Sequence, residues 1–323
     1  MILNTIPTVL FETSGTTGSP VHWWRSEKQM HLECSIMIQQ IGDADAVISF
    51  ASPSHIFGDI FGKRIPDILG IQCTAVTDIL APISFPNVSR IFIICVPSTW
   101  KILERQHKFL LPYQEITFIH SAGALPKTSM RVLEALGNRS SIFEILGSTE
   151  CGGIATRRKT SLESGQWAVL SDVNLIGPSS GTGLLEITSP RLASRSKTIP
   201  TEKCRTDDIV RRTGPASFEY LGRRDRIIKF DGRRFDLDEI DRQIEASVSK
   251  HVASVLVEDE LRGSSFDVYV EDGDPLDEAI IRKVSPLQPQ EIHLHGKLPR
   301  TTSGKIDFQH LISQSTQGLS FTQ

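Results

Sequence analysis

Near its amino terminus the chain reads Thr13-Ser14-Gly15-Thr16-Thr17-Gly18-Ser19-Pro20, directly after the apolar run from Thr8 to Phe11. The apolar run predicts a buried strand, and the two glycines free the following backbone to curl into a tight loop. Backbone N–H groups in such a loop form a concave anion site, and Ser and Thr hydroxyls add hydrogen bonds to phosphate oxygens. The stretch therefore indicates a polyphosphate-binding loop. A surface turn uses the same residue types, so this stretch alone does not distinguish a phosphate-binding loop from a turn.

Length and composition describe an ordinary globular protein. The chain has 323 residues, a formal net charge of −3 and a pI near 6.3. The length predicts two domains, and the charge gives no electrostatic support for binding nucleic acid or an anionic membrane surface. The five cysteines contain no C-x-x-C pair, and the strongest apolar run, 91–96, is too short to span a bilayer. We expect a cytoplasmic protein without a membrane span, whose partners are small molecules and other proteins.

The first half of the chain alternates short apolar runs with helical patterns. Strands are predicted at 46–50, 73–76, 90–95, 116–120 and 141–145, with helices after Ser26 and at 58–69, 98–110 and 127–136. This alternation predicts an α/β region with a largely parallel sheet. From about Gln166, closely spaced strands with Gly and Pro turns predict a small β subdomain.

A change of pattern near 222–226 predicts a domain boundary. The predicted domains are 1–222 and 223–323. The second has its own order of elements, with strands predicted at 226–230, 252–258, 265–270 and near 292 and helices at 236–249 and 275–284. We therefore expect a smaller α+β domain at the carboxyl end.

Five further clusters combine glycine or hydroxyl side chains with ionisable residues. They are Pro53-Ser54-His55-Ile56-Phe57-Gly58, Gly147-Ser148-Thr149-Glu150, Arg205-Thr206-Asp207-Asp208, Gly222-Arg223-Arg224-Asp225 and Pro299-Arg300-Thr301-Thr302-Ser303-Gly304-Lys305-Ile306. A carboxylate such as Glu150 can hold Mg²⁺ beside phosphates, and Asp208 can accept hydrogen bonds from ribose hydroxyls. Lys305 is a compact cation suited to charge that develops on phosphate or carboxylate oxygens. Taken alone, each cluster also has an ordinary explanation as a packed histidine, a helix-end acid, a turn, a solvated linker or a loop lysine.

Other nucleotide and catalytic motifs do not fit. Gly304-Lys305 fails the Walker A pattern because Pro299 stands where the earlier glycine belongs and Ile306 follows the lysine. The chain has no H-E-x-x-H and no G-x-S-x-G motif, and no G-x-G-x-x-G follows a predicted strand.

The loop and the five clusters resemble, in sequence and in order along the chain, the core motifs of the adenylate-forming superfamily. This family comprises acyl- and aryl-CoA synthetases, adenylation domains of nonribosomal peptide synthetases, and luciferases. The resemblance runs from Phe11 to Asp307. It implies an α/β fold with a shortened large domain, a parallel sheet and a small β subdomain, plus a mobile α+β domain that carries a catalytic lysine.

The resemblance also implies an activity. A carboxylic acid would be adenylated by ATP with Mg²⁺, and the acyl group would pass to the thiol of coenzyme A or of a carrier protein's phosphopantetheine arm. The acid itself stays open among aryl, medium-chain and short-chain classes. A different class of function, a non-catalytic protein of the same fold that binds nucleotide or carrier protein, is the alternative.

Residue roles follow from the resemblance alone. The loop around the ATP β- and γ-phosphates would be Thr13, Ser14, Gly15, Thr16, Thr17 and Gly18. The adenine and acyl pocket would be lined by Gly123, Ala124, Leu125, Leu146, Gly147 and Ser148. The α-phosphate and Mg²⁺ would be met by Thr149 and Glu150, and the ribose and nucleotide by Asp208 and Arg223.

The remaining implied roles concern acid, thiol and domain movement. His55 would lie near the bound carboxylate and the thiol channel, and Lys305 would contact the carboxylate and the α-phosphate oxygens. Asp225 matches the family's hinge, and Gly232 would belong to the face presented to the thiol.

The chain also departs from the family pattern. Val21 stands where the family loop usually has a lysine, Leu146 replaces an aromatic residue, and Asp207 replaces a glycine. Family members carry a long segment ahead of the phosphate loop, whereas twelve residues precede Thr13. We therefore expect an apolar surface that self-association or a partner covers.

Overall fold

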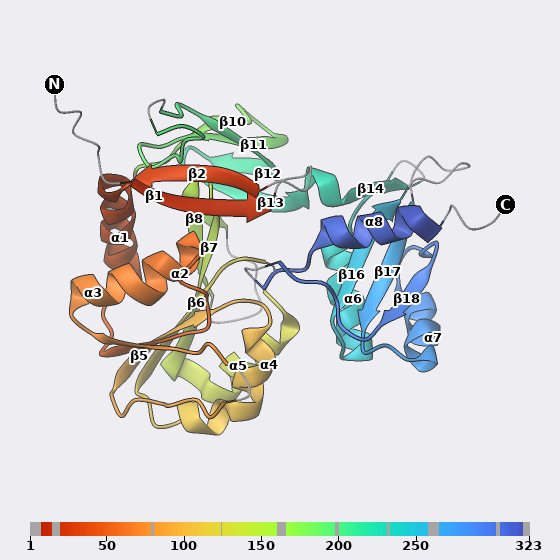
Figure 1. Ribbon diagram of the computed structural model, residues 1–323, viewed down its shortest axis with the longest axis horizontal. Coiled ribbons are helices and arrows are strands. Elements are labelled where there is room, and N and C mark those ends of the chain that lie inside the picture. The colour runs from red at the N-terminus through yellow and green to blue at the C-terminus, as the bar shows by residue number, and fades with distance from the viewer. Residues whose placement is uncertain are drawn as a thin grey trace. The chain divides into compact units, whose positions relative to one another are not determined.

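The computed structural model describes residues 8–14, 20–78, 81–123, 125–159, 166–197, 200–230, 233–257, 265–301 and 304–318. Contacts divide the chain into two units (Figure 1). The larger comprises Met1–Thr206 with Val210–Glu219, and the smaller comprises Asp207–Ile209 with Tyr220–Gln323.

Parallel strands form one half of the main sheet in the larger unit. In spatial order they are β4 (Gln72–Ala75), β3 (Ala46–Ser49), β5 (Arg90–Cys95), β6 (Glu115–His120) and β7 (Ser140–Ser148). The central strands are nearly continuous apolar runs, which is typical of parallel strands covered on both faces. Each of the five strands predicted for this region is confirmed.

Helices precede β3 or connect these strands. They are α1 (Glu27–Ile41), α2 (Ile56–Asp59), α3 (Ile65–Leu69), α4 (Thr99–Gln106) and α5 (Lys127–Leu136). Ser26 begins α1 with a capping box, because its hydroxyl accepts a hydrogen bond from the Gln29 N–H at 3.2 Å while the Gln29 side chain accepts one from the Ser26 N–H at 2.8 Å. The predicted helix at 58–69 differs in detail, because a π-helical segment, Ile60–Arg64, joins α2 to α3.

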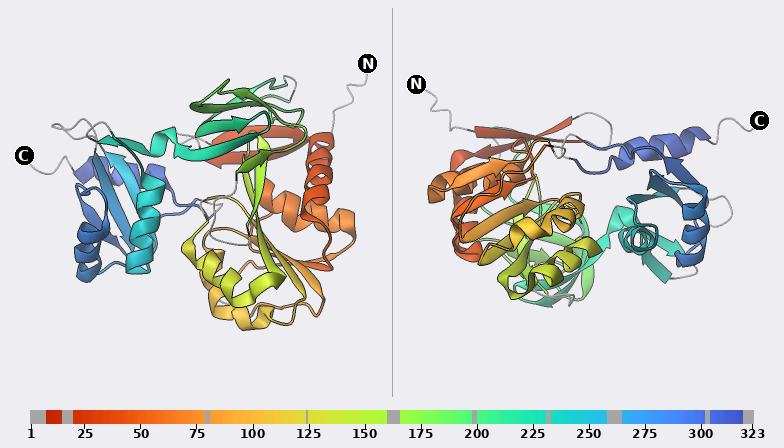
Figure 2. Two further views of the ribbon diagram at one scale, coloured as in Figure 1. Left: turned by 180° about the vertical axis from the view of Figure 1, so that it is seen from behind. Right: turned by 90° about the horizontal axis from the view of Figure 1, so that it is seen from below.

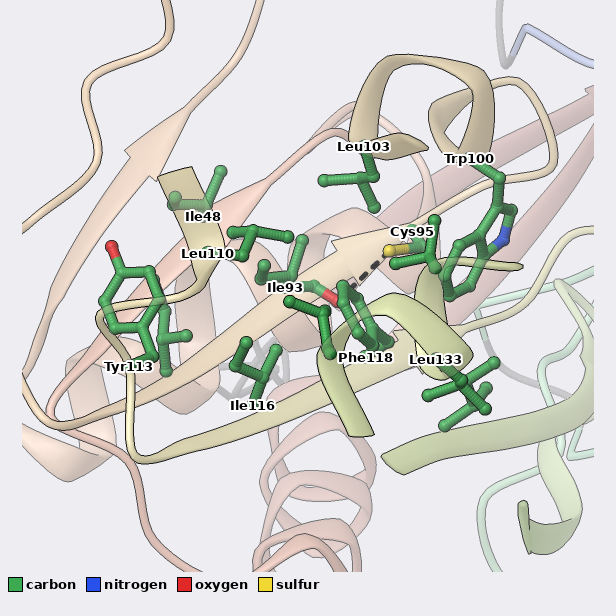
Figure 3. Close-up of a cluster of buried hydrophobic side chains, with 14 residues drawn as sticks. Ile48, Ile93, Cys95, Trp100, Leu103, Leu110, Tyr113, Ile116, Phe118 and Leu133 are labelled. Carbon is green, nitrogen blue, oxygen red and sulfur yellow. Dashed lines mark hydrogen bonds between the residues drawn. The ribbon is translucent and has the colours of Figure 1, made fainter. Parts of the chain in front are cut away.

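A buried apolar cluster fixes α4 and α5 on the parallel sheet (Figure 3). Trp100 and Leu103 of α4 and Leu133 of α5 pack against Ile93 and Phe118 of the sheet. The Trp100 and Phe118 rings lie 5.1 Å apart in a tilted arrangement that suits aromatic pairs. This core supports the strand ends that carry the candidate site.

The sheet continues into antiparallel strands, so that it has eleven strands among the described residues. They follow β7 in the order β8 (Gly152–Lys159), β9 (Trp167–Val169), β13 (Ser217–Arg223), β12 (Cys204–Gly214), β11 (Thr182–Thr188) and β10 (Asn174–Gly177). The predicted β subdomain is thus hydrogen-bonded to the parallel strands through β8.

A separate hairpin carries the predicted phosphate loop. Strand β1 (Thr8–Ser14) pairs antiparallel with β2 (Pro20–Ser26), and Phe11 lies opposite Trp23. The predicted strand forms, but it is not wholly buried: Phe11 is 3% exposed, whereas Leu10 is 38% exposed. The reason is that a two-stranded ribbon buries one face only. Residues 15–19 of the loop lie outside the described residues.

The smaller unit has a sheet with helices on both faces (Figures 1 and 2). Its elements are the hairpin β14 (Ile227–Phe230) and β15 (Arg233–Asp236), the sheet strands β16 (Val252–Val257), β17 (Ser265–Glu271) and β18 (Ile292–His295), and the helices α6 (Leu237–Val248), α7 (Pro275–Val284) and α8 (Phe308–Gly318). Helices α6 and α7 bury one sheet face, and Leu311 of α8 packs on the other beside Tyr269. In the described part of the chain, no helix is long and apolar enough to cross a membrane.

Candidate functional site

Predicted site residues of the larger unit follow the carboxyl ends of neighbouring parallel strands. His55 comes after β3, Gly123 and Leu125 come after β6, and Thr149 and Glu150 come after β7. Because parallel strands end at the same edge of a sheet, these segments gather there, where ligands of open α/β sheets bind. The strand order therefore brings together segments that are far apart in the sequence.

The turn between β7 and β8 presents two polar side chains. Its backbone is fixed, because the Ser148 hydroxyl accepts a hydrogen bond from the Cys151 N–H at 3.3 Å and the Glu150 carbonyl accepts one from the Ala193 N–H at 2.8 Å. Among the residues that the structure describes, neither the Thr149 hydroxyl nor the Glu150 carboxylate has a hydrogen-bond or ion-pair partner. A hydroxyl and a carboxylate on a fixed turn are suited to a phosphate and a hard cation.

The segment after β6 is shaped by a histidine that sequence reasoning missed. His120 is buried; its Nδ1 accepts a hydrogen bond from Trp100 Nε1 at 3.1 Å, and its Nε2 lies 3.2 Å from the Gly123 carbonyl oxygen. Because the indole N–H only donates, His120 is the tautomer that carries its proton on Nε2 and donates to Gly123. Its position at the end of a predicted strand, just before Ser121-Ala122-Gly123, was the available signal. Ala124 lies outside the described residues, and Leu146 is half-buried.

His55 occupies the residue that opens helix α2. Its Nε2 is buried and has no hydrogen-bond partner in the described structure. The sequence placed this histidine after a strand and at the start of a helix, and that local setting is what forms.

A buried charge network contacts the residues that follow the Glu150 turn. No local sequence pattern predicted it. Arg25 Nη1 is 2.6 Å from Glu33 Oε2, Arg191 Nη1 is 3.1 Å from the same oxygen, and Arg191 Nε is 2.6 Å from Asp172 Oδ2. Both guanidinium groups are almost fully buried. Burial by itself raises the pKa of Glu33, but the two guanidinium groups outweigh it and hold that pKa below its ordinary value.

This network, which we call the Arg25–Asp172 network for Arg25, Glu33, Arg191 and Asp172, requires glycine beside it. Gly152 has a φ of +71°, and a Cβ there would lie 2.5 Å from Glu33 Oε2. The Gly153 N–H donates to Glu33 Oε1 at 2.8 Å, and Arg191 Nη2 donates to the Gly153 carbonyl at 2.9 Å. The network therefore ties α1 and β2 to the first residues of β8, next to Glu150.

In the smaller unit, Asp208 and Arg223 lie together. Arg223 Nη1 is 3.7 Å from Asp208 Oδ1, and Asp208 is 9% exposed. Asp207, which stands in place of the family's glycine, pairs with Arg224 at 2.5 Å. Burial, followed by the charge of Asp208, raises the pKa of Tyr220.

The predicted hinge residue Asp225 lies in a short 3-10 helix, Arg224–Arg226. The next residue, Arg226, is buried and donates to Asp238 at 2.8 Å and to Asp241 at 2.5 Å. Arg226 therefore anchors this segment to α6. Gly232 lies outside the described residues.

Lys305 is exposed on a tight turn of the smaller unit. The Thr301 N–H donates to the Lys305 carbonyl at 2.8 Å, and Arg300 Nη2 lies 3.1 Å from Glu271 Oε2 at the end of β17. These contacts fix the base of the turn. The predicted site residues are thus divided: Asp208, Arg223 and Lys305 belong to the smaller unit and the others described above to the larger.

We expect the stability of the smaller unit to depend on pH through Asp236. It caps α6, and burial, together with the Asp238 charge, raises its pKa to about 6. Because this is above the ordinary carboxyl value of 3.8, the folded state is favoured while Asp236 is protonated and loses that advantage as the pH rises from about 4 to about 6. Asn caps equally well. We expect Asp236→Asn to stabilise the folded state above pH 6 by about 1–2 kcal/mol, after discounting for partial exposure, and not below pH 4.

Urea unfolding at several pH values measures this effect. Asp272→Asn, which changes an exposed carboxylate in the same unit, is the matched control and should leave the pH dependence unchanged. An equal gain in stability from Asp236→Asn at all pH values would contradict the assignment.

Comparisons with known proteins agree on one architecture. No family model matches the chain. The 4-coumarate–CoA ligase of Halorhodospira halophila is 24% identical over 311 residues, which cover 92% of this chain and 74% of that protein. The solved anthranilate CoA ligase AuaEII in complex with anthranoyl-AMP has a TM-score of 0.74 at 18% identity, and the McyG A-PCP structure with phenylalanyl-adenylate has one of 0.77 at 15% identity. These matches cover 95% and 100% of this chain, but 66% and 69% of the solved chains, so this chain spans about two thirds of their length.

Proposed function

We propose that the chain is a member of the adenylate-forming superfamily and that it is an ATP-dependent acid–thiol ligase. It forms an acyl-adenylate and pyrophosphate from a carboxylic acid and ATP, and then transfers the acyl group to a thiol. The observation that carries the proposal is the pair of unpartnered side chains, Thr149 and Glu150, on the fixed turn after β7. A non-catalytic scaffold has no need for such a pair.

In this proposal, the ATP phosphates are bound by two segments, the loop and the turn after β7. The loop from Thr13 to Gly18 binds the β- and γ-phosphates, and the Thr149 hydroxyl donates a hydrogen bond to an oxygen of the α-phosphate. Magnesium fits the Glu150 carboxylate, which is a hard oxygen ligand without a competing protein cation in the described structure. When bound, the ion supplies positive charge that neutralises phosphate oxygens.

The nucleoside and the acid occupy the remaining positions. Asp208 accepts hydrogen bonds from the ribose hydroxyls, while Arg223, 3.7 Å from that carboxylate, helps to hold the nucleotide. The adenine and the acyl group lie along Gly123–Leu125 and Leu146–Ser148. His120 positions Gly123 through its Nε2 proton, and His55 meets the acid carboxylate.

Adenylation itself needs stabilised charge and no protein nucleophile. A carboxylate oxygen attacks the α-phosphorus, its new bond to phosphorus forms as the bond to pyrophosphate breaks, and negative charge builds on the surrounding oxygens. Lys305 supplies a cation there, and the Thr149 hydroxyl supplies a donor. We place the functional domain boundary at 222/223, with the hinge at Asp225 and with Gly232 on the face presented to the thiol.

The acceptor is a phosphopantetheine thiol. Both coenzyme A and a carrier protein present this group, and the similar proteins include one named as a CoA ligase and one solved as an A-PCP structure. The names of these proteins also favour an aromatic acid as the substrate class to test first. Self-association, or contact with a protein partner, belongs to the same proposal.

One observation favours the alternative function, a non-catalytic nucleotide- or carrier-binding protein. Val21 stands in the hairpin where a phosphate-facing lysine is usual. Product analysis separates the two functions: the chain is incubated with ATP, Mg²⁺, an aromatic acid and either coenzyme A or a phosphopantetheinylated carrier protein. The ligase releases AMP and forms a thioester with one of the acceptors, whereas the binding protein forms neither.

A further inference from the structure

The hairpin that carries the phosphate loop has two faces of different character. Strand pairing and alternation place on one face Phe11, Thr13, Val21, Trp23 and Arg25, and on the other Leu10, Glu12, His22 and Trp24. The first face is directed at the protein, since Phe11 and Arg25 are buried. Thr13, at the end of this face, leads directly into the loop.

A short segment after the β-rich region joins this hairpin to the Glu150 turn. The Ala193 N–H donates to the Glu150 carbonyl at 2.8 Å, and Ser194 exchanges two backbone hydrogen bonds with Trp24, of 2.7 and 2.9 Å. The next residue, Arg195, places its guanidinium carbon 4.7 Å from the centroid of the Trp23 ring. Arg195 thus lies on the Thr13 face of the hairpin, two residues from a contact with the Glu150 turn.

Trp23 connects this arginine to the loop. Its Nε1 donates to the Thr13 hydroxyl at 3.1 Å, while the ring contacts Arg195. A guanidinium that stacks on an aromatic face keeps its N–H edges available for oxygens. The stack therefore holds the arginine on the Thr13 face of the hairpin without using its hydrogen-bond donors.

The charge of Arg195 is not neutralised by the described protein. In the ranges that the structure covers, no carboxylate forms an ion pair with Arg195, and its side chain is exposed. The other described cation on this face, Arg25, is bound by Glu33 at 2.6 Å. Val21, directly opposite Thr13 in the hairpin, adds no charge. This face therefore has one available cation in the described structure, and it comes from a segment distant in the sequence.

We propose that Arg195, stacked on Trp23, binds the β- and γ-phosphates of ATP and the pyrophosphate that leaves. The proposal rests on the proposed function, and it adds a residue that lies outside the six motifs that resemble the family. Arg195 supplies from the segment after Ala193 the positive charge that Val21 does not supply from β2. A planar guanidinium also suits phosphate, because it donates two parallel hydrogen bonds to one phosphate group.

Binding measurements on the full chain test this assignment. Arg195→Ala is expected to weaken binding of ATP and of pyrophosphate by about 10- to 100-fold, the usual effect of losing a charged hydrogen bond. AMP binding should change less than about threefold, because AMP lacks the β- and γ-phosphates. Calorimetric titration with each compound in turn gives the dissociation constants.

Lys197→Ala is the matched control. Lys197 is also exposed and also lies over a tryptophan of β2, but its Nζ is 4.1 Å from the centroid of Trp24, on the opposite face. The Lys197→Ala variant should bind ATP as tightly as the unchanged chain does. Arg195→Gln, which keeps much of the side-chain length, should lose ATP affinity as the alanine variant does.

Two results overturn parts of the account and can be told apart. In the first, the unchanged chain binds ATP, and Arg195→Ala and Lys197→Ala both bind it as tightly as the unchanged chain does, or Arg195→Ala weakens binding of AMP as much as binding of ATP. The role of Arg195 is then wrong and the proposed function stands. If the unchanged chain binds neither ATP nor AMP, the proposed function fails, and the role of Arg195 fails with it.

Discussion

Replacement of Lys305 by alanine is expected to slow acid adenylation by about 10²- to 10³-fold, the usual effect of removing one fixed group that stabilises transition-state charge. Affinity for ATP should change little, because the cation acts on charge that develops during the reaction. The hydrogen bond from Thr301 N–H to the Lys305 carbonyl fixes the turn through backbone atoms, so alanine leaves the turn itself intact. Single-turnover formation of the acyl-adenylate gives the rate, and a separate titration gives the affinity for ATP.

The matched control is Lys297→Ala, which removes another exposed lysine from the same unit. Its adenylation rate should equal that of the unchanged chain. If Lys305→Ala and Lys297→Ala react at the same rate, Lys305 is not a catalytic residue and the resemblance at 299–306 is without functional meaning.

The second large effect concerns stability. Arg191→Met is expected to lower the free energy of unfolding by about 3–5 kcal/mol, because it leaves buried carboxylates without their guanidinium partner. Arg191 Nε and Nη2 lie 2.6 and 2.9 Å from the two Asp172 oxygens, and Nη1 lies 3.1 Å from Glu33. Methionine fills a similar volume, so the loss arises chiefly from charge. Urea unfolding curves measure it.

Arg211→Met is the control for this stability experiment. Arg211 is exposed and pairs with Glu219 on the surface, so its loss should cost about 0–1 kcal/mol. Equal stability of the two variants would mean that the Arg25–Asp172 network does not hold the hairpin and the Glu150 turn in place. A large loss confined to Arg191→Met would support that structural role.

Sequence patterns predicted the elements whose residues carry a local signal. The strand at 90–95 contains most of the continuous apolar run 91–96, which Arg90 and Pro97 bound, and the α5 helix has clear amphipathic spacing, so both form where they were predicted. Strand β8 was missed because it begins with two glycines and ends with three charged residues, which hides any alternation. Helix α8 was missed because polar residues dominate its sequence. Its fully buried residue, Leu311, packs against Tyr269 and residues of β16, which are distant in the sequence.

Residues of the candidate site also differ in whether the sequence around them carries a local signal. Thr149, Glu150 and Asp208 could be named as candidates because each follows or lies within a predicted strand and belongs to a cluster that resembles a family motif, and their roles stay predictions. The Arg25–Asp172 network could not be found, because its members are separated by up to 166 residues (25 to 191) and nothing near any of them predicts burial. Arg195 was missed for a related reason: its stacking partner, Trp23, is on a strand more than 170 residues earlier (195 minus 23 is 172).

Exchange of labelled pyrophosphate into ATP tests the central claim most directly, because only reversible formation of an acyl-adenylate links the two compounds. The panel contains aromatic, medium-chain and short-chain acids, with Lys305→Ala as the control. We predict exchange that depends on the acid, is strongest with one class, and falls by about 10²- to 10³-fold in the Lys305→Ala variant. Tight binding of ATP without exchange for any acid would contradict the account and would identify the chain as a nucleotide-binding protein.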